Sequence, residues 1–132
     1  APMNLEMRNH VFAVDWLHPE SWRGTVAGRV GRVKSFGAMR DMRNYAPSVP
    51  NAGWHLSWLG TTEENLAKLN SFCHPEIADR TLEGLKADEY RTGGWHVDGK
   101  RMLPVDVDGS WPQWIAEGRC PPSWFRPREL AA

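Results

Sequence analysis

The sequence lacks any long hydrophobic run, because its apolar stretches extend over only a few residues. A membrane-spanning helix needs about 20 consecutive apolar residues. The N-terminal part also has no basic segment followed by an apolar one, which is the pattern of a secretory signal peptide. We therefore expect a cytoplasmic protein without a membrane span.

The sequence also lacks an excess of charge of either sign. Lys plus Arg and Asp plus Glu both number 16, so the formal net charge is zero. A protein that binds duplex nucleic acid through its phosphates shows a basic excess or stripe. The balance argues against such a partner, but it leaves room for a pocket that binds a single nucleotide.

Cysteine is scarce, with only Cys73 and Cys120. Two cysteines permit one disulfide and require none. Two free thiols are the favoured interpretation for a protein of a reducing compartment.

Common catalytic motifs are missing as well. Ser57 lies in no Gly-x-Ser-x-Gly elbow, and neither cysteine lies in a recognisable nucleophile motif. The glycines at 24, 28 and 31 match neither a Walker loop nor a dinucleotide fingerprint. The sequence therefore gives no indication of a serine hydrolase or of a nucleotide-binding fold with a glycine-rich loop.

What the chain does have is the length of one domain, 132 residues, and an unusual content of eight tryptophans and ten prolines. A chain of this length can bury a core without metals or disulfides. Tryptophan combines a large apolar face with one N–H donor, so it serves both in cores and as a platform for ligands such as sugar rings.

The first half of the chain indicates short strands. Residues 10–16 are rich in β-branched and aromatic types and predict a strand. Glycines and valines between 24 and 33 fit short strands separated by turns, or a loosely ordered loop. Methionine and arginine recur over 37–44, which suggests one or two helical turns.

Two helices are expected near the centre. Thr61 and Glu64 form a capping-box pattern, and apolar residues follow at helical spacing up to Phe72. Pro75 occupies a favoured first-turn position of a second helix, with apolar residues lining one face over 77–85.

The last third predicts a hairpin turn around Asp98-Gly99 and a short helix within 111–117. We therefore expect an α/β or α+β fold. It would form one compact domain over residues 1–132, with short strands and two central helices.

The densest group of polar and aromatic residues lies in the segment 52–58. If the segment is extended, alternation places Trp54 and Trp58 on one side. His55 and Ser57 then lie on the other side, where they would face a ligand. The alternative is a buried aromatic strand whose histidine is hydrogen-bonded in the core.

A second group, His74-Pro75-Glu76, lies where a helix is expected to begin. The N–H groups and partial positive charge of a helix start favour an anion such as phosphate. Alternatively, His74 caps the helix and Glu76 complements its dipole.

Metal binding is a further interpretation of the histidines and the glutamate in these two groups. Two histidines and one carboxylate match catalytic zinc or non-heme iron sites. His55, His74 and Glu76 supply this set, but their spacing matches no compact metal motif. His96 and Asp98 are a further pair of the same kind. The sequence alone therefore assigns no metal ligand.

Several segments occur in a fixed order along most of the chain: Trp22-x-Gly24, Arg40-Asp41-x-Arg43-Asn44, Gly53-Trp54-His55-x-Ser57-Trp58, Glu64, Lys68-Leu69-x-Ser71-Phe72, His74-x-Glu76 and Gly93-Gly94-Trp95. This series resembles the central and C-terminal part of glycosyltransferase family 17. The block from Gly53 to Glu76 carries the more specific part of the resemblance. Family members transfer N-acetylglucosamine from UDP-N-acetylglucosamine in β-1,4 linkage to a core mannose, and bacterial and phage-type relatives have less clear acceptors.

The resemblance implies the fold of the C-terminal part of a GT-A-like enzyme, together with a set of site residues. The catalytic candidates are Glu76, His55 and His74. The candidates for substrate binding are Trp54, Ser57, Trp58, Arg40 and Trp95. A UDP-sugar donor would be accompanied by Mn²⁺ or Mg²⁺ whose ligands lie outside this chain, and the acceptor would be a glycan or a similar molecule.

The family's acidic nucleotide- and metal-binding segment would precede the part that matches, and residues 1–50 contain no replacement for it. We therefore expect a fragment or a shortened form of such a transferase. An alternative is a small non-catalytic protein that retains the pocket and binds a nucleotide, a glycan or a protein. A third is a tryptophan-rich structural domain without a pocket.

Overall fold

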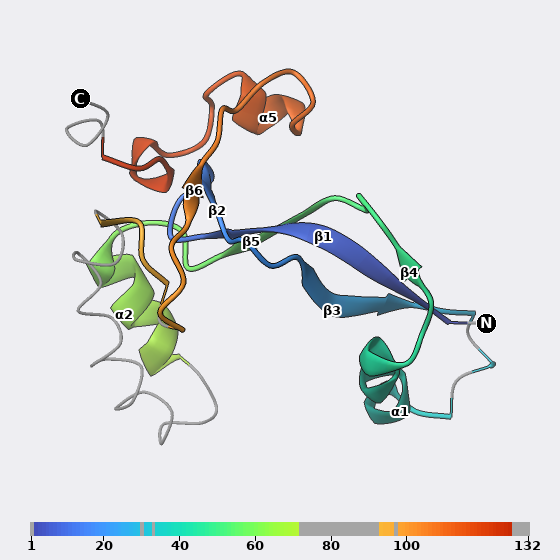
Figure 1. Cartoon of the computed structure of the whole chain (residues 1–132). Helices are drawn as coiled ribbons and strands as arrows, with labels where there is room; N and C mark the ends of the chain where they lie inside the picture. The colour runs from blue at the N-terminus through green and yellow to red at the C-terminus, as the bar shows by residue number, and fades with distance from the viewer. Residues whose placement is uncertain (1, 30, 33, 72–92, 97, 128–132) are drawn as a thin grey trace. The chain divides into compact units, whose positions relative to one another are not determined.

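A computed structural model describes residues 2–29, 31–32, 34–71, 93–96 and 98–127. Its elements are β1 (Met3–Val11), β2 (Trp16–Leu17), β3 (Trp22–Ala27), α1 (Phe36–Asp41), η1 (Met42–Asn44), β4 (Ser48–Val49), β5 (Trp54–Ser57), α2 (Thr62–Asn70), β6 (Leu103–Pro104), α5 (Gln113–Ala116) and η2 (Pro122–Trp124) (Figure 1). The second helix expected after His74 lies outside the described residues.

The strands form a six-stranded sheet around β1. β1 pairs antiparallel with β3 and with β2, and parallel with β4. β5 also pairs with β1. The Arg8 N–H donates to the Gly53 carbonyl, and the Phe12 N–H donates to the Ser57 carbonyl. Because the residue numbers increase together in the two segments, this pairing is parallel. The sheet is mixed, with antiparallel pairing between β1 and β2, β1 and β3, and β2 and β6. Such a sheet with a few short helices is an α+β fold, and the α/β alternative is wrong.

The strand expected over residues 10–16 is displaced. β1 begins at Met3 and ends at Val11, and Phe12 has a positive φ of 67° that turns the chain away. The first part of β1 alternates apolar residues, Met3, Leu5 and Met7, with polar ones, but most of the strand is half-buried, so its burial does not follow this alternation. The apolar residues Phe12, Ala13 and Val14 are instead buried in the bend and turn that follow β1.

By contrast, several local signals are confirmed. The start of the glycine- and valine-containing stretch lies in β3, which ends at Ala27, while Val30 and Val33 lie outside the described residues; the Met- and Arg-rich stretch forms α1 and η1. The capping box is present, with the Glu64 N–H donating to Thr61 Oγ1 and the Thr61 N–H donating to Glu64 Oε2. The short helix expected within 111–117 is α5.

The chain divides into two compact units. Unit 1 comprises Ala1–Asn9 and Glu20–His55, and unit 2 comprises His10–Pro19 and Leu56–Ala132. Among the described residues, no helix is both long and apolar enough to cross a bilayer.

Unit 1 is held by its strands and by one buried amide. Asn4 is fully buried, and its Nδ2 donates to the carbonyl oxygens of Arg23 (2.9 Å) and Arg43 (2.6 Å). These bonds tie β1 to β3 and to η1. A buried carbonyl without a hydrogen-bond donor costs free energy. Because Asn4 supplies the donor for both carbonyls, its side chain holds β1, β3 and η1 together.

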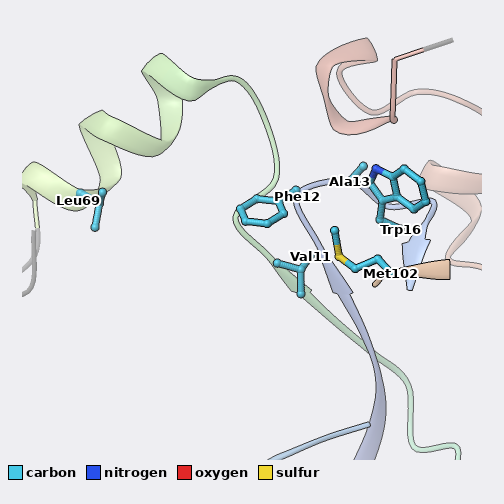
Figure 2. Packing of buried hydrophobic residues seen from close by; sticks show 6 residues of the cluster. All are labelled: Val11, Phe12, Ala13, Trp16, Leu69 and Met102. Carbon is cyan, nitrogen blue, oxygen red and sulfur yellow. The ribbon is translucent and has the colours of Figure 1, made fainter. Parts of the chain in front are cut away.

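Unit 2 contains the hydrophobic core. Its central cluster consists of Val11, Phe12, Ala13, Trp16, Leu69 and Met102 (Figure 2). These side chains come from the end of β1 and the following turn, from β2, from α2 and from the segment before β6. Helix α2 is therefore fixed to the unit by its apolar face as well as by its cap.

A glycine permits a close backbone approach in this core. Gly94 has a φ of +70°, and a Cβ there would lie 2.8 Å from the Trp16 ring. The backbone of the segment before β6 thus passes directly against an indole, and the Met102 N–H donates to the Gly94 carbonyl at 2.7 Å.

The predicted turn at Asp98-Gly99 is also present. An antiparallel bridge joins Trp95 to Arg101, and the His96 N–H donates to the Lys100 carbonyl at 2.9 Å. Gly99 has a φ of +81°, which a glycine adopts without strain.

Further along the chain Cys120 is buried, and burial raises the pKa of its thiol.

Candidate functional site

The Trp- and His-rich segment forms β5 and the residue after it. In unit 1, Gly53 has a φ of +134° and precedes Trp54 and His55, both half-buried. The His55 ring stacks on Trp22, with centroids 3.9 Å apart and planes inclined by 5°. The structure thus brings together two of the segments that carry the family resemblance, Trp22-x-Gly24 and the start of Gly53–Trp58.

In unit 2 the end of this segment has a structural role. The Ser57 carbonyl accepts the Phe12 N–H at 3.0 Å. Trp58 has a positive φ of 55°, so the strand ends before it and the alternation predicted for residues 54–58 does not extend to it. Its ring packs against the hydrophobic core, with Lys68 Nζ 4.6 Å from the ring centroid. Of the two interpretations of the segment, packing describes Trp58 better.

Arg40 lies in α1 and lines a cavity in unit 1. The cavity has a volume of about 380 Å³ and is lined by Gly24, Thr25, Val26, Phe36, Met39 and Arg40. Helix α1 buries none of its own residues, and Phe36 is 93% exposed. The cavity therefore presents one guanidinium and one aromatic ring beside apolar strand residues, a combination that suits a ligand with an anionic and a flat part.

The remaining predicted residues are not part of this cavity. Trp95 lies in unit 2, where it is 42% exposed and Arg101 lies 5.6 Å from its ring centroid. His74 and Glu76 lie outside the described residues. The predicted catalytic set of His55, His74 and Glu76 therefore remains a prediction.

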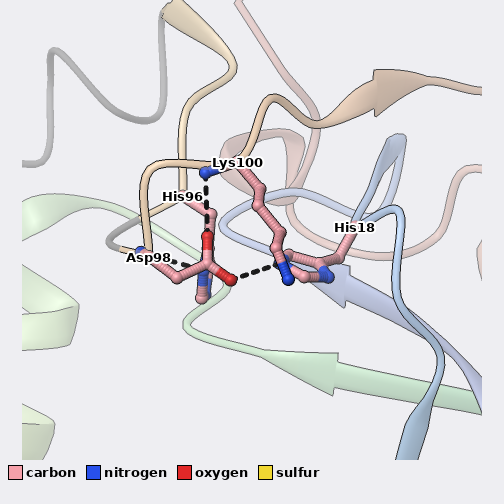
Figure 3. A network of polar contacts seen from close by, with 4 residues as sticks. All are labelled: His18, His96, Asp98 and Lys100. Atoms are coloured by element: carbon pink, nitrogen blue, oxygen red, sulfur yellow. Dashed lines mark hydrogen bonds and ion pairs between the residues drawn. The ribbon is translucent and has the colours of Figure 1, made fainter.

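A second group of polar side chains lies in unit 2, where His18, His96 and Asp98 converge. His18 Nε2 is 3.0 Å from Asp98 Oδ2, and His96 Nδ1 is 2.8 Å from Asp98 Oδ1 (Figure 3). The two imidazole rings meet edge to face, with centroids 4.6 Å apart. One carboxylate therefore bridges two histidines.

The strand pairing explains how these residues meet. Leu17 pairs with Leu103, so His18, which follows β2, lies beside the segment that precedes β6. His96 and Asp98 belong to the turn in that segment. The Lys100 N–H donates to Asp98 Oδ1 at 3.0 Å and fixes the carboxylate.

The electrostatics of this group centre on Asp98. Partial burial by itself would raise the pKa of the Asp98 carboxyl. Hydrogen bonds from the Lys100 N–H, His96 and His18 outweigh this effect and hold the pKa well below its ordinary value. The carboxylate is therefore ionised over the whole physiological range, which is the form that binds cations.

Sequence reasoning identified His96 and Asp98 as a pair but did not connect them with His18. The pair has a local signal, a His-x-Asp spacing in a predicted turn. His18 has none, because only the pairing of β2 with β6 brings it to that turn.

No protein-family model matches this chain, and comparisons with curated proteins and with solved structures gave no significant match. The expected likeness to the C-terminal part of a GT-A-like enzyme thus gains no support from these comparisons. Functional inference therefore rests on the residues of the chain itself.

Proposed function

We propose that this chain is a glycosyltransferase-like protein that transfers N-acetylglucosamine, or a related sugar, from a nucleotide-sugar to a glycan or other acceptor. The observation that supports the proposal is the cavity lined by Gly24 and Arg40. Both residues belong to segments that resemble glycosyltransferase family 17. Its volume of about 380 Å³ also falls in the range of small-molecule sites.

The chemistry of the cavity matches the donor. A guanidinium forms strong charge-assisted hydrogen bonds with phosphate, so Arg40 would bind the diphosphate and stabilise it as it departs. The exposed ring of Phe36 offers a face on which a base or sugar ring can stack. Gly24, Thr25 and Val26 of β3 complete the lining.

Inverting transfer also requires a base for the acceptor hydroxyl. In this proposal Glu76 or His55 takes that role, and His74 assists at the diphosphate. The parallel stack of His55 on Trp22 restricts the orientation of its imidazole, as a positioned base requires. Mn²⁺ or Mg²⁺ would accompany the donor.

Calorimetry with UDP-N-acetylglucosamine, with and without Mn²⁺, tests donor binding. We expect Arg40→Gln to weaken binding by about 10- to 100-fold, because a hydrogen bond to a charged group contributes about 1.5–3 kcal/mol. Arg43→Gln is the matched control, since Arg43 is exposed and does not line the cavity. No heat with the wild type at millimolar nucleotide-sugar, or equal effects of the two substitutions, would refute the proposed donor site.

The same cavity also fits the alternative of a non-catalytic protein that retains the pocket. Donor hydrolysis separates the two. Turnover by the wild type that falls in Glu76→Gln supports the transferase, whereas donor binding without turnover supports the binding protein.

A further inference from the structure

The cluster of His18, His96 and Asp98 has no role in the proposed sugar transfer, and all three residues belong to unit 2. From its geometry we infer that these three side chains form a Zn²⁺ site, with His18 Nε2, His96 Nδ1 and the Asp98 carboxylate as ligands. The inference is independent of the nucleotide-sugar proposal, because it concerns different residues and a different ligand.

The first support is the convergence of the donor atoms. One ligand atom from each residue can be chosen so that no two lie farther apart than 4.8 Å. Ligand atoms around a tetrahedral zinc lie roughly 3.3 Å apart, given zinc–ligand bonds of about 2.0 Å. His18 Nε2 lies 3.0 Å from Asp98 Oδ2 and His96 Nδ1 lies 2.8 Å from Asp98 Oδ1, so each histidine is close to this spacing from one oxygen of the carboxylate. Small rotations of the side chains would bring all three to bonding distance.

The second support is preorganisation. His18 is buried, with only 4% of its side chain exposed, and it follows a strand that is paired with β6. The backbone N–H of Lys100 donates a hydrogen bond to Asp98 Oδ1 and holds the carboxylate in place. Hydrogen bonds to ligating carboxylates of this kind orient metal ligands in proteins. The ligands are therefore held before a metal binds.

The third support is the orientation of the ligands. His18 Nε2 and His96 Nδ1 both point at the Asp98 carboxylate, 3.0 Å and 2.8 Å from its two oxygens. With Zn²⁺ bound, His18 Nε2 and His96 Nδ1 would each present a lone pair to the metal, and each neutral imidazole would carry its proton on its other ring nitrogen.

The kind of metal follows from the donors and from access. Two imidazoles and one carboxylate are the set of catalytic zinc sites, in which water or substrate takes the fourth position. The Asp98 side chain is 35% exposed, so solvent reaches the cluster on that side. A non-heme iron site keeps several positions open, whereas His18 is buried and leaves less of the cluster accessible. Mg²⁺ prefers oxygen ligands and would compete poorly.

One nearby charge acts against the site. Figure 3 shows the Lys100 side chain extending toward His18. An ammonium group near a bound cation lowers its affinity, so removing this charge should tighten zinc binding. A network that serves only as a hydrogen-bonded support for the turn would show no such gain in metal affinity.

The test is calorimetric titration of the EDTA-treated and dialysed full chain with ZnCl₂, supported by the visible spectrum after Co²⁺ substitution. We expect one Zn²⁺ per chain, no competition from excess Mg²⁺, and the intense Co²⁺ bands of four-coordinate geometry. Asp98→Asn keeps the volume of the side chain but removes the anionic ligand. It should weaken Zn²⁺ binding by at least about 100-fold, the upper end of the effect of altering an outer-shell partner.

Controls separate this site from other zinc-binding groups. Asp106→Asn removes an exposed carboxylate outside the cluster, and Cys73→Ser removes a thiol; both should bind Zn²⁺ as tightly as the wild type. His96→Gln provides a second ligand variant, and circular dichroism in EDTA confirms that each variant is folded. Absence of stoichiometric Zn²⁺ binding, wild-type affinity in Asp98→Asn, or loss of binding in Cys73→Ser would overturn the inference.

Discussion

The two units of this chain are built in different ways. In unit 1 the buried residues among those described are Asn4 and Ala46, one of them polar. In unit 2 the buried set includes the six-residue apolar cluster as well as Trp111, Ile115 and others. Unit 1 is thus organised by hydrogen bonds around one amide, whereas unit 2 is organised by apolar packing.

The difference extends to the two candidate sites. The cavity of unit 1 is lined by side chains of a helix that buries none of its residues, so Arg40 and Phe36 can adjust to a ligand. The histidine cluster of unit 2 is anchored on a packed core and a paired strand. An adjustable site suits a flexible organic ligand, whereas a metal requires ligands that are already in place.

The largest expected effect tests the apolar packing of unit 2. Leu69 is 2% exposed within the core cluster. Leu69→Ala should lower the free energy of unfolding by about 2–5 kcal/mol, because it removes buried methyl groups and leaves a cavity. Urea denaturation measures this change. Leu103→Ala, at a residue that is 51% exposed, is the control and should cost much less. Similar losses in both variants would contradict a core centred on this cluster.

A smaller effect tests the polar anchor of unit 1. Asn4→Ala should lower stability by about 2 kcal/mol, because it leaves the Arg23 and Arg43 carbonyls without their donor. Hydrogen exchange of the Val26 amide, opposite Asn4 in the sheet, should accelerate. Asn44→Ala, at an exposed position, should leave both quantities nearly unchanged. An Asn4→Ala variant as stable as the wild type would remove the contrast between the units.

The smallest effect compares the same interaction in both units. Thr61 and Ser35 each accept a hydrogen bond at the start of a helix, but only α2 buries residues in a core. Thr61→Ala should cost about 1 kcal/mol of global stability. Ser35→Ala should fray α1 without a measurable change in the urea midpoint, because α1 contributes no buried surface. Equal shifts of the midpoint would show that α1 is coupled to the fold more strongly than its exposure indicates.

The parts of the fold that could be predicted from sequence are those set by near neighbours. The capping box at Thr61 and Glu64, and the glycine turn at Gly99, depend on residues a few positions apart. The strand prediction over residues 10–16 overlaps only the end of β1, because it followed the β-branched and aromatic residues there and not the apolar–polar alternation from Met3 to Arg8. The turn after Val11 contains the buried apolar residues Phe12, Ala13 and Val14. Its composition therefore resembles that of a strand, and this is why the strand prediction includes it.

The candidate sites follow the same rule. The resemblance points to Gly24 and Arg40, which the structure places at one cavity, but no sequence signal singles out Phe36 as part of it. Sequence reasoning also noted His96 and Asp98. His18 stayed unrecognised because a pairing between strands distant in sequence brings it to them. Long-range pairing of this kind cannot be read from one sequence.

The contact between Gly94 and the Trp16 ring has a consequence for the evolution of this chain. Any side chain at position 94 would collide with the indole, and the φ of +70° disfavours other residues there as well. A substitution at 94 thus becomes acceptable only after residue 16 has become smaller and the loop has changed its backbone conformation. In divergent relatives, positions 94 and 16 should therefore change together. Such covariation would help to recognise relatives whose overall sequence identity is low.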